Sequence, residues 1–130
     1  MVIDSSAVIA ILLNESDSES YARALEADAK LKMSAASYLE AGIVFDQRGD
    51  VLAPRAFDRF IRRAGIEIVP FDLQQAEIAR QAYRDFGKGR HPAGLTFGDC
   101  FSYALAMALD EPLLFKGRDF SQTDVQVCPL

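Results

Sequence analysis

Four acidic residues differ from the other carboxylates of this chain because apolar residues surround them in the sequence. Most of the 19 Asp and Glu residues are expected at the solvated surface. The exceptions are Asp4, Glu40, Asp99 and Asp119. A buried carboxylate is costly unless it is paired, and no Lys or Arg lies within six residues of the first three acids. A long-range ion pair or a shared metal ion would have to supply the missing positive charge.

The residue types in this group favour a particular kind of metal. Carboxylate oxygens are hard ligands that suit Mg²⁺ or Mn²⁺, whereas zinc sites use Cys and His. The chain has one His, and Cys100 and Cys128 lack the spacing of zinc ligands, so we expect ordinary reduced thiols. If the four acids meet in space, the sequence predicts an oxygen-rich site for a divalent cation.

The elements that must bring these acids together alternate between strand-like and helix-like patterns. Short apolar runs predict strands at residues 1–4, 31–34, 66–69 and 113–115, with an additional edge strand at 125–127. Helical patterns predict helices at residues 7–13, 18–29, 36–48 and 97–109, a helix that ends at Gly65, and another that Asp72 caps. This alternation is typical of a three-layer α/β/α domain with a mainly parallel sheet of about five strands.

The expected positions of the four acids converge on one edge of that sheet. In an open parallel sheet, the carboxyl ends of strands and the beginnings of the following helices meet at a crevice where the strand order reverses. Asp4 and Asp119 follow expected strands. Asp99 opens an expected helix, and Glu40 lies in the first part of another. All four side chains can therefore face one cleft.

Length and composition limit the classes of protein to which the chain can belong. Its 130 residues and 14.3 kDa correspond to one domain, residues 1–130, that can bury about two-thirds of its surface. Half of the residues are apolar and a quarter are charged, which excludes a disordered tail and a coiled coil. The longest early apolar run has seven residues, so we expect no signal peptide, no membrane span and a cytoplasmic location. The net charge of −5 argues against tight nucleic-acid binding by charge alone, but not against a nucleic acid held through metal ions.

Four stretches of the sequence resemble PIN-domain ribonucleases, specifically the VapC toxins of bacterial and archaeal toxin–antitoxin pairs. They are VIDSSA at residues 2–7, SAASYLE at 34–40, GLTFGDCFSYALA at 94–106 and PLLFKGRDFSQTD at 112–124. Together they extend from the first expected strand nearly to the last. The acidic quartet of the family then falls on Asp4, Glu40, Asp99 and Asp119, with Asp124 as a candidate supplementary acid.

The resemblance implies a cytoplasmic toxin that acts as a metal-dependent endoribonuclease. Two Mg²⁺ or Mn²⁺ ions would activate a water against an RNA phosphodiester and stabilise the leaving oxygen. We expect Asp4 and Asp99 to be the central ligands, and Glu40 and Asp119 to hold the second ion or its waters. Because members of the family dimerise and bind an antitoxin peptide, we also expect a homodimer, a toxin–antitoxin hetero-oligomer and a partner groove on the early helices.

Other polar residues near these motifs have simpler interpretations. Ser5 and Ser6 are good helix-capping types, and together with Thr96 they are candidates to touch a metal-bound water. A serine nucleophile is disfavoured because the only His, His91, lies in a Pro-flanked loop. Candidate RNA-phosphate contacts in that loop are Lys88, Arg90 and His91. A basic and solvated helix face is expected at Arg55, Arg59, Arg62 and Arg63.

Two other functional classes remain open at this stage. A phosphomonoester hydrolase or a receiver-like phosphoryl-transfer domain also places acids at strand ends, but it uses an aspartate nucleophile, a second Asp two residues later and a supporting Lys. Ser6 occupies the position two residues after Asp4. The remaining class is a non-catalytic protein-interaction subunit. RNA degradation that requires Mg²⁺ or Mn²⁺ and stops with EDTA would distinguish a ribonuclease from both.

Overall fold

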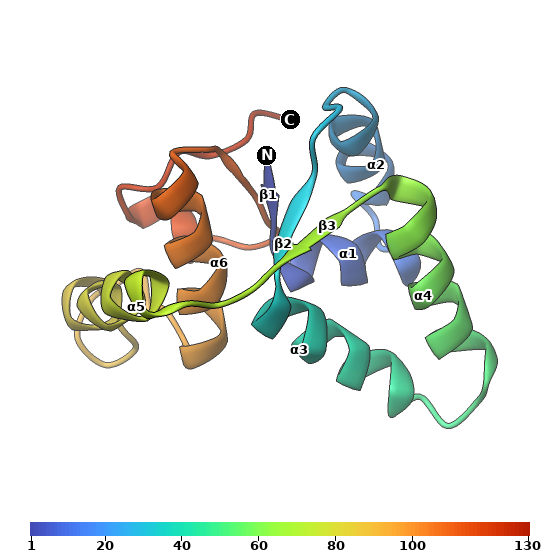
Figure 1. The fold of residues 1–130 in the computed structure, drawn as a ribbon, viewed down its shortest axis with the longest axis horizontal. Helices are drawn as coiled ribbons and strands as arrows, with labels where there is room; N and C mark the ends of the chain where they lie inside the picture. The colour runs from blue at the N-terminus through green and yellow to red at the C-terminus, as the bar shows by residue number, and fades with distance from the viewer.

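A short parallel sheet organises the molecule. The computed structural model describes residues 1–130 and contains a four-stranded sheet (Figure 1). Its strands are β1 (Val2–Ile3), β2 (Lys32–Ser34), β3 (Glu67–Val69) and β4 (Leu113–Leu114). All neighbours are parallel and the order is β3-β2-β1-β4. The strand order therefore reverses beside β1, between the strands that precede Asp4 and Asp119.

Six α-helices cover the two faces of this sheet. They are α1 (Ser5–Leu12), α2 (Ser18–Glu26), α3 (Ala35–Asp46), α4 (Leu52–Ala64), α5 (Leu73–Phe86) and α6 (Phe97–Leu109), and a short 3₁₀ helix, η1 (Phe120–Gln122), follows β4. Helices α1 to α4 lie on one side of the sheet, and α5 and α6 lie on the other (Figure 1). None of the helices is both long enough and apolar enough to cross a membrane. The predicted three-layer α/β/α architecture is confirmed.

The two central strands contribute to both hydrophobic cores. Ile3 and Leu114 pack in the cluster under α1 to α4, whereas Val2 and Leu113 pack in the cluster under α5 and α6. Successive side chains of a strand point to opposite faces, so a strand that is covered on both faces must be apolar at every position. This requirement explains why the sequence around the first and fourth strands shows continuous apolar runs rather than alternation.

Most of the predicted elements are confirmed within three residues, and one prediction is wrong. Gly65 ends α4 in the left-handed conformation with φ 67°, and Asp72 caps α5 by accepting from Gln75 N at 2.9 Å. The expected edge strand at 125–127 does not form. Val127 makes only an isolated bridge with Leu113, because the backbone hydrogen bonds between the two segments involve Leu113 alone on the β4 side: Leu113 N donates to Gln126 O, and Cys128 N donates to Leu113 O. The sheet therefore has four strands rather than five.

The cysteines behave as expected from their spacing. Cys100 and Cys128 are free, and Cys100 is buried in α6. Burial raises the pKa of the Cys100 thiol to about 11, which keeps it protonated near neutral pH.

An ion pair joins β2 to the segment that precedes β4. Lys32 Nζ lies 2.6 Å from Glu111 Oε2, and the amino group of Met1 lies 2.8 Å from Glu111 Oε1. Both side chains of the Lys32–Glu111 pair are 22% exposed. Burial raises the pKa of Glu111, but the hydrogen bonds and positive charges of its two partners lower it more, so the pKa lies below the ordinary value of 4.5.

Replacement of Glu111 with Gln should lower the free energy of unfolding by about 1–3 kcal/mol at pH 7, because a partly buried, charge-assisted hydrogen bond is lost. The pKa of Glu111 is lower in the folded state than in the unfolded state, so the stabilisation is complete above pH 4.5 and disappears as the pH falls through the folded-state pKa. Urea unfolding of both proteins from pH 7 to pH 3 would measure this convergence. Glu19→Gln, which alters an exposed pair with Arg23, is the control and should change little.

Candidate active site

Asp4 occupies the junction between β1 and α1 and is held entirely by neutral donors. Its Oδ2 accepts from Ser6 N at 3.0 Å and from Ser6 Oγ at 2.6 Å, and its Oδ1 accepts from Ser102 Oγ at 2.6 Å. The residue is 4% exposed. No cationic group forms an ion pair with it. The carboxylate is therefore fixed in direction while its charge remains uncompensated.

Asp4, rather than Ser5 or Ser6, is the N-cap of α1, which corrects the capping prediction. The three residues are all good capping types, so local sequence does not decide between them. Because the cap is Asp4, the hydroxyls of both serines are free to bind carboxylates. Ser6 Oγ donates to Asp4, and Ser5 Oγ donates to Glu40 Oε1 at 2.6 Å.

Asp99 lies in the first turn of α6 and forms a capping box with Thr96. The backbone N–H of Asp99 donates to Thr96 Oγ1 at 3.2 Å, and Thr96 N donates to Asp99 Oδ2 at 3.0 Å. Thr96 thus has a capping role in the structure. Burial, together with the negative charges of Asp4 and Asp119, raises the pKa of Asp99 to about 6 against the lowering effect of the Thr96 hydrogen bonds. Asp4 and Asp119 therefore lie close enough to Asp99 to repel its charge.

Glu40 is exposed near the middle of α3 and lies beside the beginnings of α1 and α6. It belongs to α3, and its Oε1 accepts from Ser5 at the start of α1. Its Oε2 lies against Gly98 at the start of α6, where an added Cβ would overlap the carboxylate. Gly98 is therefore needed for the close approach of this backbone to the side chain. Glu40 therefore contacts Ser5, which follows Asp4, and Gly98, which precedes Asp99.

Asp119 reaches the same edge of the sheet from the loop after β4. It is exposed, it precedes η1, and its side chain caps no backbone N–H. Its charge contributes to the raised pKa of Asp99. Since β4 lies beside β1, the loop that carries Asp119 lies beside the junction that carries Asp4. The four acids of the predicted quartet thus lie around the reversal of strand order, as the crevice argument requires.

Asp124 and the basic loop residues have other surroundings. Asp124 accepts a short hydrogen bond from the hydroxyl of Tyr103, a buried residue of α6. Burial raises the pKa of Tyr103, and the bond to Asp124 raises it further, so the tyrosine remains a donor. Asp124 therefore anchors the C-terminal segment to α6. Lys88 and Arg90 are exposed in the loop between α5 and α6 and form no ion pair.

Sequence reasoning missed two residues that contact this group. Ser102 donates to Asp4, and Ser37 shares a hydrogen bond of 3.0 Å with Ser102. The available signal was modest: a serine stands three residues after Asp99 in an otherwise apolar helix, and another stands three residues before Glu40. In a helix, residues three apart share a face, so both hydroxyls were candidates to face the acids.

The donor set fits a divalent cation of the hard class. All of the side chains that converge are carboxylates or hydroxyls, and no Lys or Arg neutralises them. No three Asp, Glu, His or Cys side chains come close enough together to form a complete ligand group by themselves. Mg²⁺ is commonly held by one or two carboxylates, with waters and substrate phosphates completing its shell, so the arrangement suits that ion.

Comparison with known proteins identifies the family of this chain. The PIN domain family model matches residues 1–126. Ribonuclease VapC28 of Mycobacterium tuberculosis is 53% identical over 127 residues, which cover 97% of this chain and 96% of that protein. The chain belongs to the PIN-domain family of VapC ribonucleases. Ribonuclease VapC of Mycolicibacterium smegmatis is 51% identical to this PIN domain over 125 residues, covering 96% of this chain and 97% of the relative.

Solved structures have the same fold as this PIN domain. The TM-score is 0.76 with Mycobacterium tuberculosis VapC20, a toxin that cleaves the sarcin–ricin loop, at 15% identity and 98% coverage of both chains. It is 0.73 with a chain of a toxin–antitoxin complex from Klebsiella pneumoniae, at 17% identity and coverage of 99% of this chain and 97% of that chain. At these identities the likeness concerns the fold alone.

Gly98→Ala tests the geometry around Glu40 in this PIN domain. The new methyl group should displace the Glu40 carboxylate and break its hydrogen bond with Ser5, and we expect RNA cleavage to fall about 10- to 100-fold. Thermal stability should change little, because a flexible side-chain end can move and Ala suits a helix. Gly42→Ala is the matched control, since its Cβ would make an ordinary 3.5 Å contact with Phe57. Equal cleavage by the two variants would contradict the role of this contact.

Proposed function

We propose that this protein is the toxin of a toxin–antitoxin pair and hydrolyses RNA phosphodiester bonds at the acidic site, using two Mg²⁺ or Mn²⁺ ions. The observation that carries the proposal is the group of carboxylates at the strand reversal, which is held by hydroxyls and has no protein cation. When bound, the ions would activate the attacking water and stabilise the leaving 3′-oxygen.

The side chains have distinct roles in this proposal. Asp4 and Asp99 are the central cation ligands, and Glu40 and Asp119 hold the second ion or its waters. Ser6 orients Asp4, and Ser5 orients Glu40, through hydrogen bonds of 2.6 Å. Thr96 restrains Asp99 through the capping box. The chain needs no nucleophilic side chain, because water is the attacking group.

The alternatives explain the contacts less well. A serine nucleophile requires a base, but Ser5 and Ser6 donate to carboxylates, and His91 Nδ1 accepts from Ala93 N at 3.0 Å. A receiver-like phosphoryl-transfer site requires a lysine in the acidic pocket. Lys116 follows β4 at a suitable place, but its Nζ lies 3.0 Å from Glu15 and 3.1 Å from Asp17. These hydrogen bonds raise the pKa of Lys116 and keep its charge with the α1–α2 turn.

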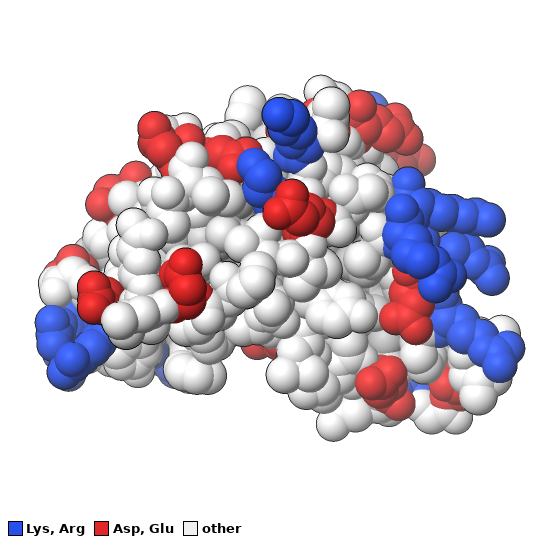
Figure 2. Space-filling model, viewed as in Figure 1, with Lys and Arg blue, Asp and Glu red and all other residues white.

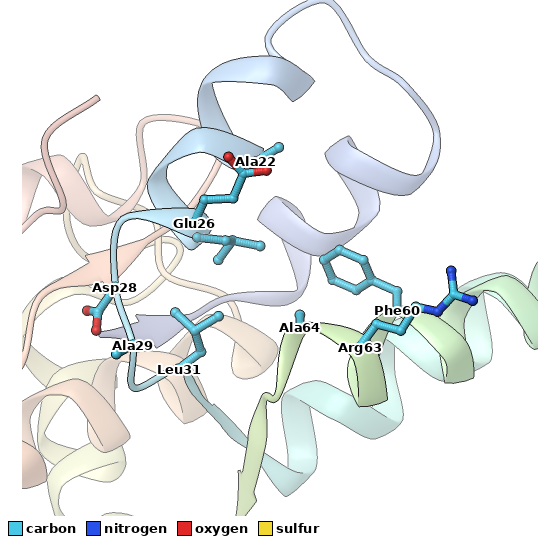
Figure 3. A pocket seen from close by; sticks show the side chains of 9 residues that line it. Ala22, Glu26, Asp28, Ala29, Leu31, Phe60, Arg63 and Ala64 are labelled. Carbon is cyan, nitrogen blue, oxygen red and sulfur yellow. The ribbon is translucent and has the colours of Figure 1, made fainter.

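An antitoxin helix is the proposed occupant of a hollow between α2 and α4. The hollow has a volume of about 510 Å³ and is lined mainly by apolar side chains. Leu31 and Phe60 face it, and the guanidinium of Arg63 points outward at its rim (Figure 3). Figure 2 shows Lys and Arg side chains gathered over α4; the exposed residues in this patch are Arg55, Arg59, Arg62 and Arg63. Glu26 and Asp28 also line the hollow, so it fits an amphipathic partner that places an acidic flank along the arginines of α4.

A second copy of the chain is the proposed partner at a different surface. Leu39 and Ile43 of α3 and Phe97 of α6 are 61%, 44% and 78% exposed. They lie along an apolar hollow that Glu40 and Gly98 also line, so this surface adjoins the acidic site. A homodimer would cover these apolar side chains and bring two sites near each other. The proposed compartment is the cytoplasm, where RNA is present and free thiols such as Cys100 and Cys128 persist.

Asp4→Asn and Asp99→Asn test the catalytic proposal. Loss of a residue that only orients a metal ligand typically lowers metal affinity or activity by about 10- to 100-fold. Loss of a ligand itself should therefore reduce RNA cleavage by more than about 100-fold. The melting temperature of Asp99→Asn should be unchanged or higher, because a repelling charge is removed and one oxygen can still accept from Thr96 N, whereas Asp4→Asn loses an acceptor and should melt at a slightly lower temperature. Cleavage of labelled RNA with Mg²⁺ or Mn²⁺, stopped by EDTA, is the measurement, and Asp58→Asn on the exposed face of α4 is the control. A folded variant with wild-type cleavage would refute the assignment.

Lys88→Gln combined with Arg90→Gln tests the proposed RNA contacts. Loss of two phosphate contacts should weaken binding. The slope of log K against log salt concentration should become less steep by about 1.4 for single-stranded RNA. Binding would be measured by fluorescence anisotropy at several salt concentrations in the inactive Asp99→Asn background. The control is Arg55→Gln with Arg59→Gln, which neutralises two charges on α4. Affinity that is unchanged at low salt would reject the loop as an RNA contact.

A further inference from the structure

A line of three buried side chains links α3, α6 and β1. Ser37 Oγ and Ser102 Oγ lie 3.0 Å apart, and Ser102 Oγ lies 2.6 Å from Asp4 Oδ1. Ser37 is 1% exposed and Ser102 is 0% exposed. Neither hydroxyl can reach solvent. Each must therefore satisfy its hydrogen-bonding capacity inside the protein, and these two hydrogen bonds do so.

The direction of the hydrogen bonds follows from the chemistry of the groups. An ionised carboxylate only accepts, so the single hydroxyl proton of Ser102 is committed to Asp4. Ser102 must then be the acceptor in its bond with Ser37, whose proton is directed toward Ser102. Ser37 therefore fixes the rotation of the Ser102 hydroxyl, and Ser102 fixes Asp4. Bonds in such a chain polarise and strengthen one another.

The positions of the two serines connect this line to the rest of the quartet. Ser37 precedes Glu40 by three residues in α3, and Ser102 follows Asp99 by three residues in α6. The hydrogen bond between the serines therefore joins the two helices that carry Glu40 and Asp99. Asp4 Oδ2 is held separately by Ser6, so the serine pair controls only the Oδ1 side of the carboxylate.

We propose that Ser102 and Ser37 are positioning residues that hold Asp4 in the orientation needed to bind a divalent cation. The proposal rests on the proposed function, in which Asp4 is a cation ligand. Removal of Ser102 would leave the buried Asp4 Oδ1 without its donor and would also cost stability, so the test of positioning is cation binding by the folded variant rather than stability. The role that we assign to the two serines is to fix the orientation of Asp4 Oδ1.

Titration with Mn²⁺ alone, followed by electron paramagnetic resonance without RNA, tests the proposal. Ser102→Ala should weaken Mn²⁺ binding about 10- to 100-fold, the usual effect of losing a partner that orients a ligand. Ser37→Ala should weaken it at least about 2-fold. In the Ser102→Ala background, Ser37→Ala should have no further effect, because Ser37 acts through Ser102. Independent packing roles would instead give additive losses.

The controls separate this inference from the proposed function. Ser18, the first residue of α2, is another buried serine, and its hydroxyl donates to Asn14 Oδ1 before the helix. Ser18→Ala should leave Mn²⁺ binding unchanged. Mn²⁺ binding by Asp4→Asn equal to that of wild type would overturn both the cation site and this inference. Binding that depends on Asp4 but is unaffected by Ser102→Ala would overturn the inference alone. If Ser102→Ala does not fold, as judged by circular dichroism, unchanged binding by folded Ser37→Ala would overturn it.

Discussion

Repulsion between carboxylates at one edge of the sheet is the constraint on which the rest of the site depends. The structure holds Asp4 with serine donors and Asp99 with a capping box, and neither arrangement supplies a positive charge. Burial and the neighbouring acids raise the pKa of Asp99 to about 6, and no Lys or Arg forms an ion pair with Asp4 or Asp99. A divalent cation would relieve this repulsion, so the same feature that costs stability favours cation binding.

The acids also have structural roles at the ends of their elements. Asp4 caps α1, and Asp99 completes the capping box of α6. Strand–helix junctions at the carboxyl edge of a parallel sheet need side chains that accept from free backbone N–H groups. Carboxylates meet this requirement and keep a negative charge at this edge of the sheet. The fold and the site therefore use the same residues, and an isosteric Asn is the substitution that separates the two roles.

Charge is distributed so that different surfaces suit different partners. The protein carries a net charge of −5, but four arginines lie on the exposed face of α4 beside an apolar hollow. The acidic site lies elsewhere, at the beginnings of α1 and α6, next to the exposed apolar side chains of Leu39 and Phe97. This separation is compatible with a partner helix on α2 and α4, a second copy near the site, and RNA at the carboxylates.

Local patterns in the sequence determined the class of the fold, the bounds of α6, the caps at Gly65 and Asp72, and the four unusual acids. Periodicity and capping depend on neighbouring residues, which explains that success. The strand order, the use of Asp4 instead of a serine as the cap, and the loss of the strand at 125–127 depended on tertiary packing. So did the contact from Ser102 to Asp4, whose residues are 98 positions apart. Only the folded sheet brings β1 against α6, and no local pattern encodes which hydroxyl then meets which carboxylate.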